Sequence, residues 1–157
     1  MKTLIAIDPG MNGGIVSTRW EASALPMPKT LHDIDEEFSS HSERDIEIRK
    51  EGGEATTTVY LENVHSMPGQ GVASSFKFGR GFGQLEGLCA AYGFRVIYVS
   101  PQKWQKGLGL LTNKGESKTQ HKNKIKAFAQ QRYPHIKVTL ATADALAILE
   151  YAKLQEK

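Results

Sequence analysis

The sequence predicts an α/β fold in which one sheet carries helices on both faces. Three observations support this: short apolar strands alternate with longer amphipathic segments, Gly and Pro residues separate them, and no internal repeat or low-complexity tract breaks the order. A chain of 157 residues is long enough to bury a core without disulfides, so a single domain over residues 1–157 is expected.

Five segments have the composition of strands, being rich in β-branched, aromatic and other apolar residues. The first stops at Asp8, just before a turn with one proline and three glycines, and the fourth stops at Glu62. A turn with so few side chains would let a phosphate approach Asp8 closely. The predicted strands are residues 3–7, 14–19, 21–27, 57–62 and 94–100.

Five other segments show helical periodicity or helix-end signals. The expected helices are residues 30–50, 73–92, 101–107, 118–133 and 142–154, with a basic, flexible loop at 107–119. In the second helix, Ser74 or Ser75 is the expected N-cap and Gly93 marks the end. This helix carries four glycines, each of which costs about 1 kcal/mol relative to alanine. The cost predicts that the helix lies close to another backbone.

Charge is distributed unevenly, although the net charge is only +3. Residues 30–56 hold nine acidic and three basic residues, a local charge of −6, whereas residues 103–126 hold seven lysines and one acid, a local charge of +6. A charged run usually marks a solvated surface. Seven lysines beside loop glycines favour a surface that binds a polyanion.

The cysteine content and the N-terminal residues indicate the cellular compartment in which the protein is expected. Cys89 is the only cysteine, so an internal disulfide is impossible and a reducing compartment is expected. The apolar run after Lys2 ends at Asp8, which is too short for a signal peptide or a transmembrane helix. We therefore expect a cytoplasmic or nucleoid protein with no membrane partner.

Three carboxylates lie at predicted strand ends or at a predicted helix start, which are the places where α/β proteins commonly form binding and active sites. Asp8 and Glu62 end strands, and Asp144 lies in the expected first turn of the last helix. Clustered carboxylates need a cation, and hard oxygen ligands favour Mg²⁺ or Mn²⁺, two of which suit in-line attack on a phosphodiester. Each residue also has a simpler interpretation: Asp8 as a turn or cap residue, Asp144 as an ordinary helix-start aspartate, and Glu62 as a salt-bridge partner.

Four motifs, taken in order, give the sequence a resemblance to a known family. They are IAIDPGMNGGIV, VYLENV, the basic SKTQHKNK and ADALAI. Together they resemble the RuvC-type Holliday-junction resolvases. The block SSFKFGRGFGQLEGLCAAYGFRVIYVSPQKWQKGLGL is especially similar to the phage-encoded and plastid branch. The resemblance covers most of residues 1–27 and 59–154, and the acidic segment 30–56 matches least.

The resemblance implies an RNase H-like fold with a mixed five-stranded sheet flanked by helices. It also implies a homodimer that makes paired, symmetric nicks in four-way DNA junctions, in a bacterial host, and is encoded by a phage or a bacterium. It assigns Asp8, Glu62 and Asp144 as catalytic residues that hold two Mg²⁺ or Mn²⁺ ions, one to activate water and one to stabilise the leaving 3′ oxygen. It assigns Lys118 as the lysine near the scissile phosphate.

Two positions depart from the family pattern. The family usually has a further metal-site acid or histidine one helical turn before the last aspartate, and this position holds Ala141. Two explanations of Ala141 are open. It is the natural residue of a variant in which three carboxylates suffice for metal binding, or it results from an Asp-to-Ala change, in which case the chain binds junctions but cleaves them poorly. A second family lysine is replaced by Gln105, and Lys103 or Lys106 is expected to take over its role.

DNA contacts are expected on the basic segment and around the glycine-rich helix. His65 lies where relatives place an aromatic wedge near the junction centre, whereas Trp104 is interpreted as a core anchor. By resemblance, the glycine-rich helix helps form the dimer interface and faces the crossover. The expected DNA-binding residues are His65, Phe76, Lys77, Arg80, Lys103, Lys106, Lys114, Lys122 and Lys124.

Two other functions fit the same residues. A non-catalytic RNase H-like protein would bind branched DNA through the same surface, and Ala141 and Gln105 favour this alternative. A broader nuclease would act on flaps, replication forks or RNA–DNA hybrids. Metal-dependent junction cleavage separates the resolvase from the first alternative, and competition between a junction and a linear duplex separates it from the second.

Overall fold

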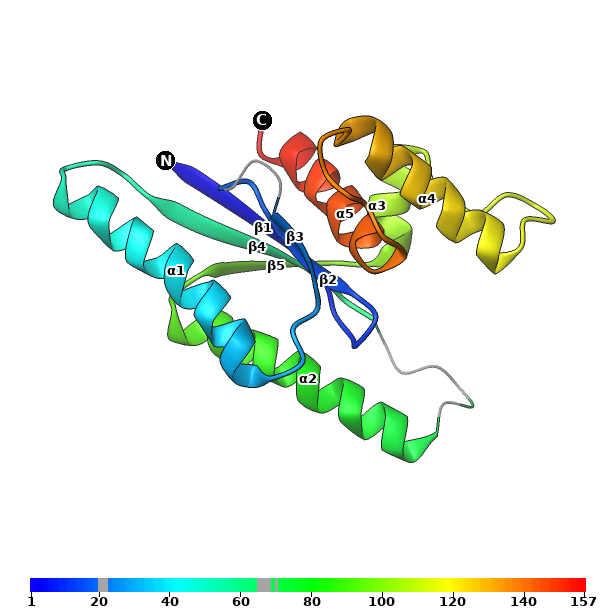
Figure 1. The fold of residues 1–157 in the computed structure, drawn as a ribbon, viewed down its shortest axis with the longest axis horizontal. Coiled ribbons are helices and arrows are strands. Elements are labelled where there is room, and N and C mark those ends of the chain that lie inside the picture. The colour runs from blue at the N-terminus through cyan, green and yellow to red at the C-terminus, as the bar shows by residue number, and fades with distance from the viewer. Residues whose placement is uncertain (20–22, 65–68, 70) are drawn as a thin grey trace.

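The structure is a computed structural model of the chain, and it describes residues 1–19, 23–64, 69 and 71–157. One five-stranded sheet, with strand order β3-β2-β1-β4-β5, forms its centre (Figure 1). The strands are β1 (Lys2–Asp8), β2 (Gly14–Ser17), β3 (Ser23–Pro26), β4 (Thr56–Glu62) and β5 (Arg95–Val99). The first three strands pair antiparallel, and β1, β4 and β5 pair in parallel. The predicted mixed sheet is therefore confirmed.

Helices cover both faces of the sheet, as the sequence predicts. They are α1 (Leu31–Lys50), α2 (Val72–Ala91), α3 (Pro101–Leu108), α4 (Lys118–Arg132) and α5 (Leu140–Gln155). The first two lie on one face and the other three on the opposite face (Figure 1). Across the described ranges, no helix is long and apolar enough to cross a membrane.

Alternate residues of the central strands pack against the two helical layers. Ile5 and Ile7 of β1 face the core shared with α1 and α2, whereas Leu4 and Ala6 face the core shared with α5. Every residue of α5 from 142 to 149 is buried. Trp104 of α3 is completely buried in the same core, which confirms it as a core anchor.

Side chains that accept hydrogen bonds from free backbone N–H groups fix most helix starts. Thr30 caps α1, and Ser100 caps α3, which ends at Gly109 in the left-handed conformation. Reciprocal capping boxes begin the last two helices. These pairs are Ser117 with Gln120 for α4 and Thr139 with Thr142 for α5.

Two helix starts differ from the prediction. The N-cap of α2 is Gly71, whose extended backbone conformation starts the helix without a side-chain bond, so neither Ser74 nor Ser75 is the cap. The capping box makes α5 begin at Leu140, so Asp144 lies in its second turn and not in its first. The predicted end of α2 at Gly93 is confirmed, because this residue has a φ of 67°.

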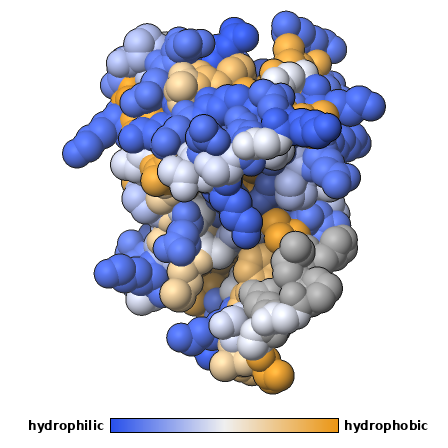
Figure 2. All heavy atoms as spheres, turned by 90° about the vertical axis from the view of Figure 1, so that its right-hand side faces the viewer, coloured by the Kyte–Doolittle hydropathy of each residue, from blue (hydrophilic) through white to orange (hydrophobic). Residues whose placement is uncertain are grey.

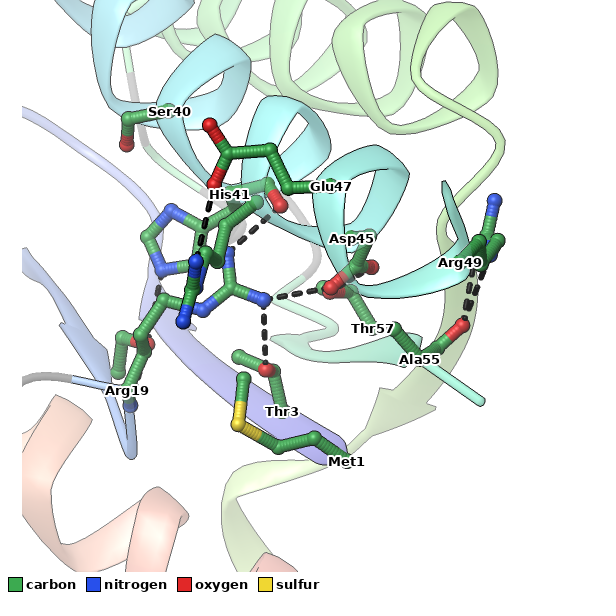
Figure 3. A network of polar contacts seen from close by, with 12 residues as sticks. Met1, Thr3, Arg19, Ser40, His41, Asp45, Glu47, Arg49, Ala55 and Thr57 are labelled. Atoms are coloured by element: carbon green, nitrogen blue, oxygen red, sulfur yellow. Dashed lines mark hydrogen bonds and ion pairs between the residues drawn. The ribbon is translucent and has the colours of Figure 1, made fainter. Parts of the chain in front are cut away.

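A buried polar network ties α1 to the sheet (Figure 3). The guanidinium of Arg19 pairs with Asp45 at 2.5 Å and donates to Thr3 Oγ1 at 3.0 Å and to the His41 carbonyl oxygen at 2.6 Å. The other Asp45 oxygen accepts a hydrogen bond of 2.7 Å from the Thr57 hydroxyl. The Arg19 and Asp45 side chains are only 7% and 4% exposed. The acidic segment thus contributes a buried ion pair to the fold.

Candidate active site

The parallel register of β1 and β4 brings two predicted carboxylates to the same edge of the sheet. Ile7 pairs with Leu61, so Asp8 and Glu62 follow as neighbours on adjacent strands. The two carboxyl groups are close enough for each to affect the pKa of the other. The two strands end on the side of the molecule where α2 and α5 begin, at the right of Figure 1.

The turn after β1 needs its glycines for contacts within the chain. A Cβ atom on Gly13 would lie 2.0 Å from the carbonyl oxygen of Asp8. A Cβ atom on Gly14 would lie 2.8 Å from the Leu25 carbonyl oxygen and 2.9 Å from the Ala141 carbonyl oxygen. Gly14 therefore lets the first turn of α5 approach β2 closely. The approach of a phosphate, which the sequence suggested, is not needed to explain these two glycines.

Trp104 fixes the position of Glu62. Its indole Nε1 donates a hydrogen bond of 2.8 Å to Glu62 Oε1, and Glu62 itself is 5% exposed. Because Trp104 is completely buried between α3 and α5, the donor has little freedom to move. The hydrophobic core thus positions one carboxylate of the candidate site.

Asp144 enters the site from α5 and meets a lysine of α4. Lys122 Nζ forms an ion pair with Asp144 Oδ2, and the Asp144 side chain is 9% exposed. The second oxygen, Oδ1, is buried and has no hydrogen-bond partner within the described part of the chain. A buried polar atom without a protein partner is uncommon, so this oxygen is available to a water molecule or a cation.

The three carboxylates interact electrostatically. Burial, followed by the charges of Glu62 and Asp144, raises the pKa of Asp8 to about 8, and Lys122 opposes this rise. Burial also raises the pKa of Glu62, although the hydrogen bond from Trp104 opposes the shift. Burial lowers the pKa of Lys122, but the nearby carboxylates more than offset this and raise it overall. The site therefore favours a cation.

The donor chemistry of the site fits a hard divalent cation. Asp8, Glu62 and Asp144 all offer carboxylate oxygens, and the unpartnered Oδ1 of Asp144 is available to a ligand. In their present positions, however, no three acidic, His or Cys side chains of the described residues form a preformed metal cluster. Trp104 and Lys122 each engage one carboxylate, so an ion would have to draw these side chains together. These residues would hold Mg²⁺ or Mn²⁺.

The hydroxyl groups beside Ala141 at the start of α5 are already engaged in hydrogen bonds. The hydroxyls of Thr139 and Thr142 lie 3.2 Å apart and hydrogen-bond to each other, and each accepts from a backbone N–H of the cap. Their lone pairs are therefore engaged in starting the helix. Asp144 is the one acidic residue in the first two turns of α5.

Most of the predicted DNA-binding lysines are exposed, and they lie on α3, on α4 and in the loop between these helices. Lys118 occupies the first turn of α4, and Lys122 follows one turn later. Within the described residues, the ammonium of Lys118 forms no ion pair, so Lys122 and not Lys118 contacts the carboxylates. The exposed lysines among the predicted DNA-binding residues are Lys77, Lys103, Lys106, Lys114 and Lys122, and Lys118, predicted as catalytic, is exposed as well.

Lys124 has a structural contact of its own. Its ammonium donates to the Leu111 carbonyl oxygen at 2.8 Å and pairs with Glu116 at 2.9 Å. Glu116 also accepts a hydrogen bond from the backbone N–H of Asn113 at 2.8 Å. Lys124 therefore fastens the loop before α4 to the helix.

The first turns of α2 project beyond the sheet (Figure 1). Phe76 is 72% exposed, and Lys77 and Arg80 are exposed beside it. Figure 2 faces this side of the molecule and shows a hydrophilic upper part over α4 and hydrophobic atoms at the lower end. The predicted wedge residue His65 lies outside the described residues.

Sequence reasoning missed the two contacts that organise the site. Trp104 was interpreted only as a core residue, and Lys122 only as a phosphate contact. The spacing of Lys118 and Lys122 does place both on one face of a helix, which was a usable signal. Their distances from the carboxylates depend on how α4 packs on α5, which the sequence does not show.

Comparisons with known proteins support the fold. No family model matches the chain, and no curated protein matches it. A structure of RuvC from Thermus thermophilus is 18% identical, with a TM-score of 0.50, covering 98% of this chain and 96% of that chain. A structure of T. thermophilus RuvC in complex with a Holliday junction substrate is 17% identical, with a TM-score of 0.53, covering 97% and 96%. The predicted RNase H-like fold is confirmed.

Proposed function

We propose that this protein is a structure-selective endonuclease that resolves four-way DNA junctions by paired, symmetric nicks. The observation that carries the proposal is the meeting of Asp8, Glu62 and Asp144, from three separate elements, at the carboxyl edge of an RNase H-like sheet. The fold is shared with a T. thermophilus RuvC structure that contains a Holliday junction substrate, which supports the choice of substrate. The motif block at residues 74–110 supports the phage-encoded and plastid branch.

The residues of the chain prepare the site for a divalent cation. Bound there, Mg²⁺ or Mn²⁺ would supply an activated water and stabilise the leaving oxygen. Trp104 holds Glu62 in place, and the glycine turn brings the start of α5 against β2. Burial and the neighbouring carboxylates raise the pKa of Asp8 to about 8. Binding of a cation would favour the ionised form of this carboxyl group.

The exposed lysines supply the DNA-binding surface. Lys103 and Lys106 are exposed on α3, Lys114 is exposed in the loop before α4, and Lys118 is assigned to the phosphate at the point of cleavage. Lys77 and Arg80 are exposed on α2 and are assigned further phosphate contacts. Since these contacts are to phosphates, the affinity for a junction is expected to fall steeply as the salt concentration rises.

The exposed face of α2 is the proposed homodimer interface. Val72 and Phe76 are exposed on the same face as Gly79, Gly83 and Gly87. Apart from the adjacent backbone of α2 itself, no atom of the described chain lies within 4 Å of a Cβ built on these glycines. Nothing within the chain therefore compensates for their low helix propensity. A second copy of α2, related by a two-fold axis, would cover the exposed apolar residues, and the glycines would let the two helices approach closely. Gly83→Leu should give a monomer in sedimentation without loss of helix signal.

The decisive experiment incubates the chain, and a variant with Ala141→Asp, with a labelled mobile four-way junction in Mg²⁺ or Mn²⁺. Asp8→Asn serves as the inactive control. Paired nicks by the chain itself would establish that three carboxylates suffice. Paired nicks by Ala141→Asp alone would establish a resolvase disabled at one metal ligand.

A junction-binding protein without nuclease activity is the second candidate. The methyl side chain of Ala141 at the start of α5, where the family has a ligand, favours it. Tight junction binding with no cleavage by either version would establish this function and exclude the resolvase. Equal cleavage of a junction and a linear duplex would instead establish a broader nuclease.

A further inference from the structure

We propose that a cavity at the amino edge of the sheet binds a phosphate group, either free or on a small molecule, through the guanidinium groups of Arg49 and Arg95. The parallel strands β1, β4 and β5 begin at this edge, whereas Asp8 and Glu62 lie where β1 and β4 end. The cavity is therefore a second site, at the opposite edge of the sheet from the candidate active site. The inference goes beyond the proposed function and does not depend on it.

The cavity lies between the C-terminal half of α1 and the starts of β4 and β5, and its volume is about 490 Å³. Sites for small molecules commonly measure about 300–1,000 Å³. The helix lines the cavity with Ser42, Asp45 and Arg49, and the strands line it with Thr56 and Arg95. Because Arg49, Thr56 and Arg95 are exposed, the cavity opens to solvent and is accessible to a small molecule.

Two guanidinium groups of the cavity have no acidic partner among the described residues. Arg49 Nε and Nη2 donate to the Ala55 carbonyl oxygen at 3.2 Å and 2.8 Å, which holds this guanidinium beside the start of β4 (Figure 3). Arg95 is exposed at the first position of β5. Across the described ranges, no carboxylate forms an ion pair with either arginine. Both charges therefore remain available to an anion, and the planar guanidinium suits the oxygens of a phosphate.

Two carboxylates at this edge of the sheet are already neutralised within the chain. Asp45 pairs with Arg19 through one oxygen and accepts a hydrogen bond of 2.7 Å from the Thr57 hydroxyl through the other. Glu156 pairs with Lys2, which also lines the cavity. Each of these ion pairs carries no net charge, so the two unpaired arginines leave two positive charges. A phosphate monoester carries nearly two negative charges at neutral pH and matches them.

Neutral hydrogen-bond donors and open space complete the site. The side chains of Ser42 and Thr56 line the cavity, and a hydroxyl group can donate to a phosphate oxygen. Gly93 lines it as well, with a φ of 67°. Apart from its neighbours in the chain, no atom of the described structure lies within 4 Å of a Cβ built on Gly93, so this wall is unobstructed. The cavity thus combines positive charge, neutral donors and room for a ligand.

The charge around the cavity favours a small anion over DNA. Residues 30–56, which include α1, carry a net charge of −6. A duplex along this side of the molecule would meet those carboxylates, whereas a single phosphate needs to contact only the two arginines. Of the residues that the structure describes along the cavity, none belongs to the predicted DNA-binding set. The ligand is therefore assigned to the class of small phosphates.

The test titrates isotope-labelled protein with sodium phosphate, and separately with AMP, at constant ionic strength, and follows the backbone amide signals by NMR. Saturable shifts are expected at Ser42, Thr56 and Arg95, with a Kd below about 1 mM for at least one of the two probes. Tighter binding of AMP would identify a phosphate ester as the ligand, and tighter binding of phosphate would identify the free anion. Shifts that grow linearly with both probes would overturn the proposal.

Arg95→Gln removes one of the two charges and should weaken binding of the probe about tenfold. Arg44→Gln is the matched control, because it removes the same charge from an exposed position of α1 that pairs with Glu47 and does not line the cavity. The control should bind the probe as tightly as the unmodified chain. Equal affinities of the unmodified chain and Arg95→Gln would overturn the proposal. If Arg95→Gln does not fold, saturation of the unmodified chain still decides.

A junction-binding assay separates the small ligand from DNA. Fluorescence anisotropy with a labelled four-way junction should give the same affinity for Arg95→Gln as for the unmodified chain, because Arg95 lies at the opposite edge of the sheet from the carboxylates. A weaker affinity of Arg95→Gln for the junction, without saturable binding of phosphate or AMP, would assign the arginine to DNA and overturn the proposal. Saturable phosphate binding by a chain that does not bind or cleave junctions would support the cavity site and overturn the resolvase.

Discussion

The indole of Trp104 donates a 2.8 Å hydrogen bond to the carboxylate of Glu62. This contact joins the hydrophobic core between α3 and α5 to a carboxylate at the edge of the sheet. A side chain held by a completely buried neighbour keeps one orientation, as a ligand must before its ion arrives. Trp104 is therefore a positioning residue for the candidate site.

Trp104→Phe tests this role. The substitution keeps an aromatic ring but leaves the buried Glu62 oxygen without its donor, which should lower the free energy of unfolding by about 1–3 kcal/mol. It should also weaken Mn²⁺ binding, measured by calorimetry. Tyr98→Phe is the control, because it removes an exposed hydrogen bond to Glu86 and should leave Mn²⁺ binding unchanged. Unaltered Mn²⁺ affinity in Trp104→Phe would contradict the positioning role.

The buried ion pair between Arg19 and Asp45 should contribute strongly to stability. Asp45→Ala leaves the guanidinium buried without a counter-charge and should lower the free energy of unfolding in urea by about 3–5 kcal/mol. The exposed pair of Arg44 and Glu47, at 3.0 Å on the same helix, is the control. Glu47→Ala should cost less than about 1 kcal/mol. Equal effects of the two substitutions would show that burial does not set the strength of this pair.

Stability should depend on pH through His41. Burial lowers the pKa of this ring below its ordinary value of 6.5, although the carbonyl of Glu37 and the charge of Asp45 oppose the shift and Arg19 supports it. The unfolded chain then binds a proton that the folded chain does not. The contribution of His41 is therefore complete above pH 6.5 and is lost as the pH falls below it.

Urea unfolding as a function of pH measures this effect. The slope attributable to His41 is at most about 1.4 kcal/mol per pH unit. His41→Gln should flatten the profile below the ordinary histidine pKa, while His32→Gln, at an exposed position of the same helix, should leave it unchanged. An unaltered profile for His41→Gln would show that another group controls acid sensitivity.

Replacing Gly13 or Gly81 by alanine should change the free energy of unfolding in opposite directions. Gly13→Ala forces a Cβ atom into the carbonyl of Asp8 and should lower the free energy of unfolding by more than about 3 kcal/mol. Gly81→Ala places a methyl group in open space within α2 and should raise it by about 0.5–1 kcal/mol. Thermal unfolding of both variants checks the contrast, and a stable Gly13→Ala protein would contradict the turn geometry.

Local sequence signals predicted much of the fold and part of the site. Strands that end at Asp8 and Glu62 follow from apolar runs bounded by turns. Their parallel pairing, with Ile7 opposite Leu61, comes from the structure and not from the sequence. Contacts between distant elements could not be predicted in this way. Asp45 belongs to a polar, acidic segment, and its burial against Arg19 depends on how α1 crosses the sheet. The pairing of Lys122 with Asp144 likewise depends on the packing of α4 on α5.

The most direct test of the proposed resolvase function is cleavage of a labelled four-way junction in Mn²⁺, in competition with a linear duplex of equal length. We expect paired nicks at symmetric positions of the junction, little cleavage of the duplex, and complete loss of nicking in Asp8→Asn. An intact junction after incubation with both the folded protein and Ala141→Asp, or cleavage that persists in Asp8→Asn, would contradict the proposed resolvase function.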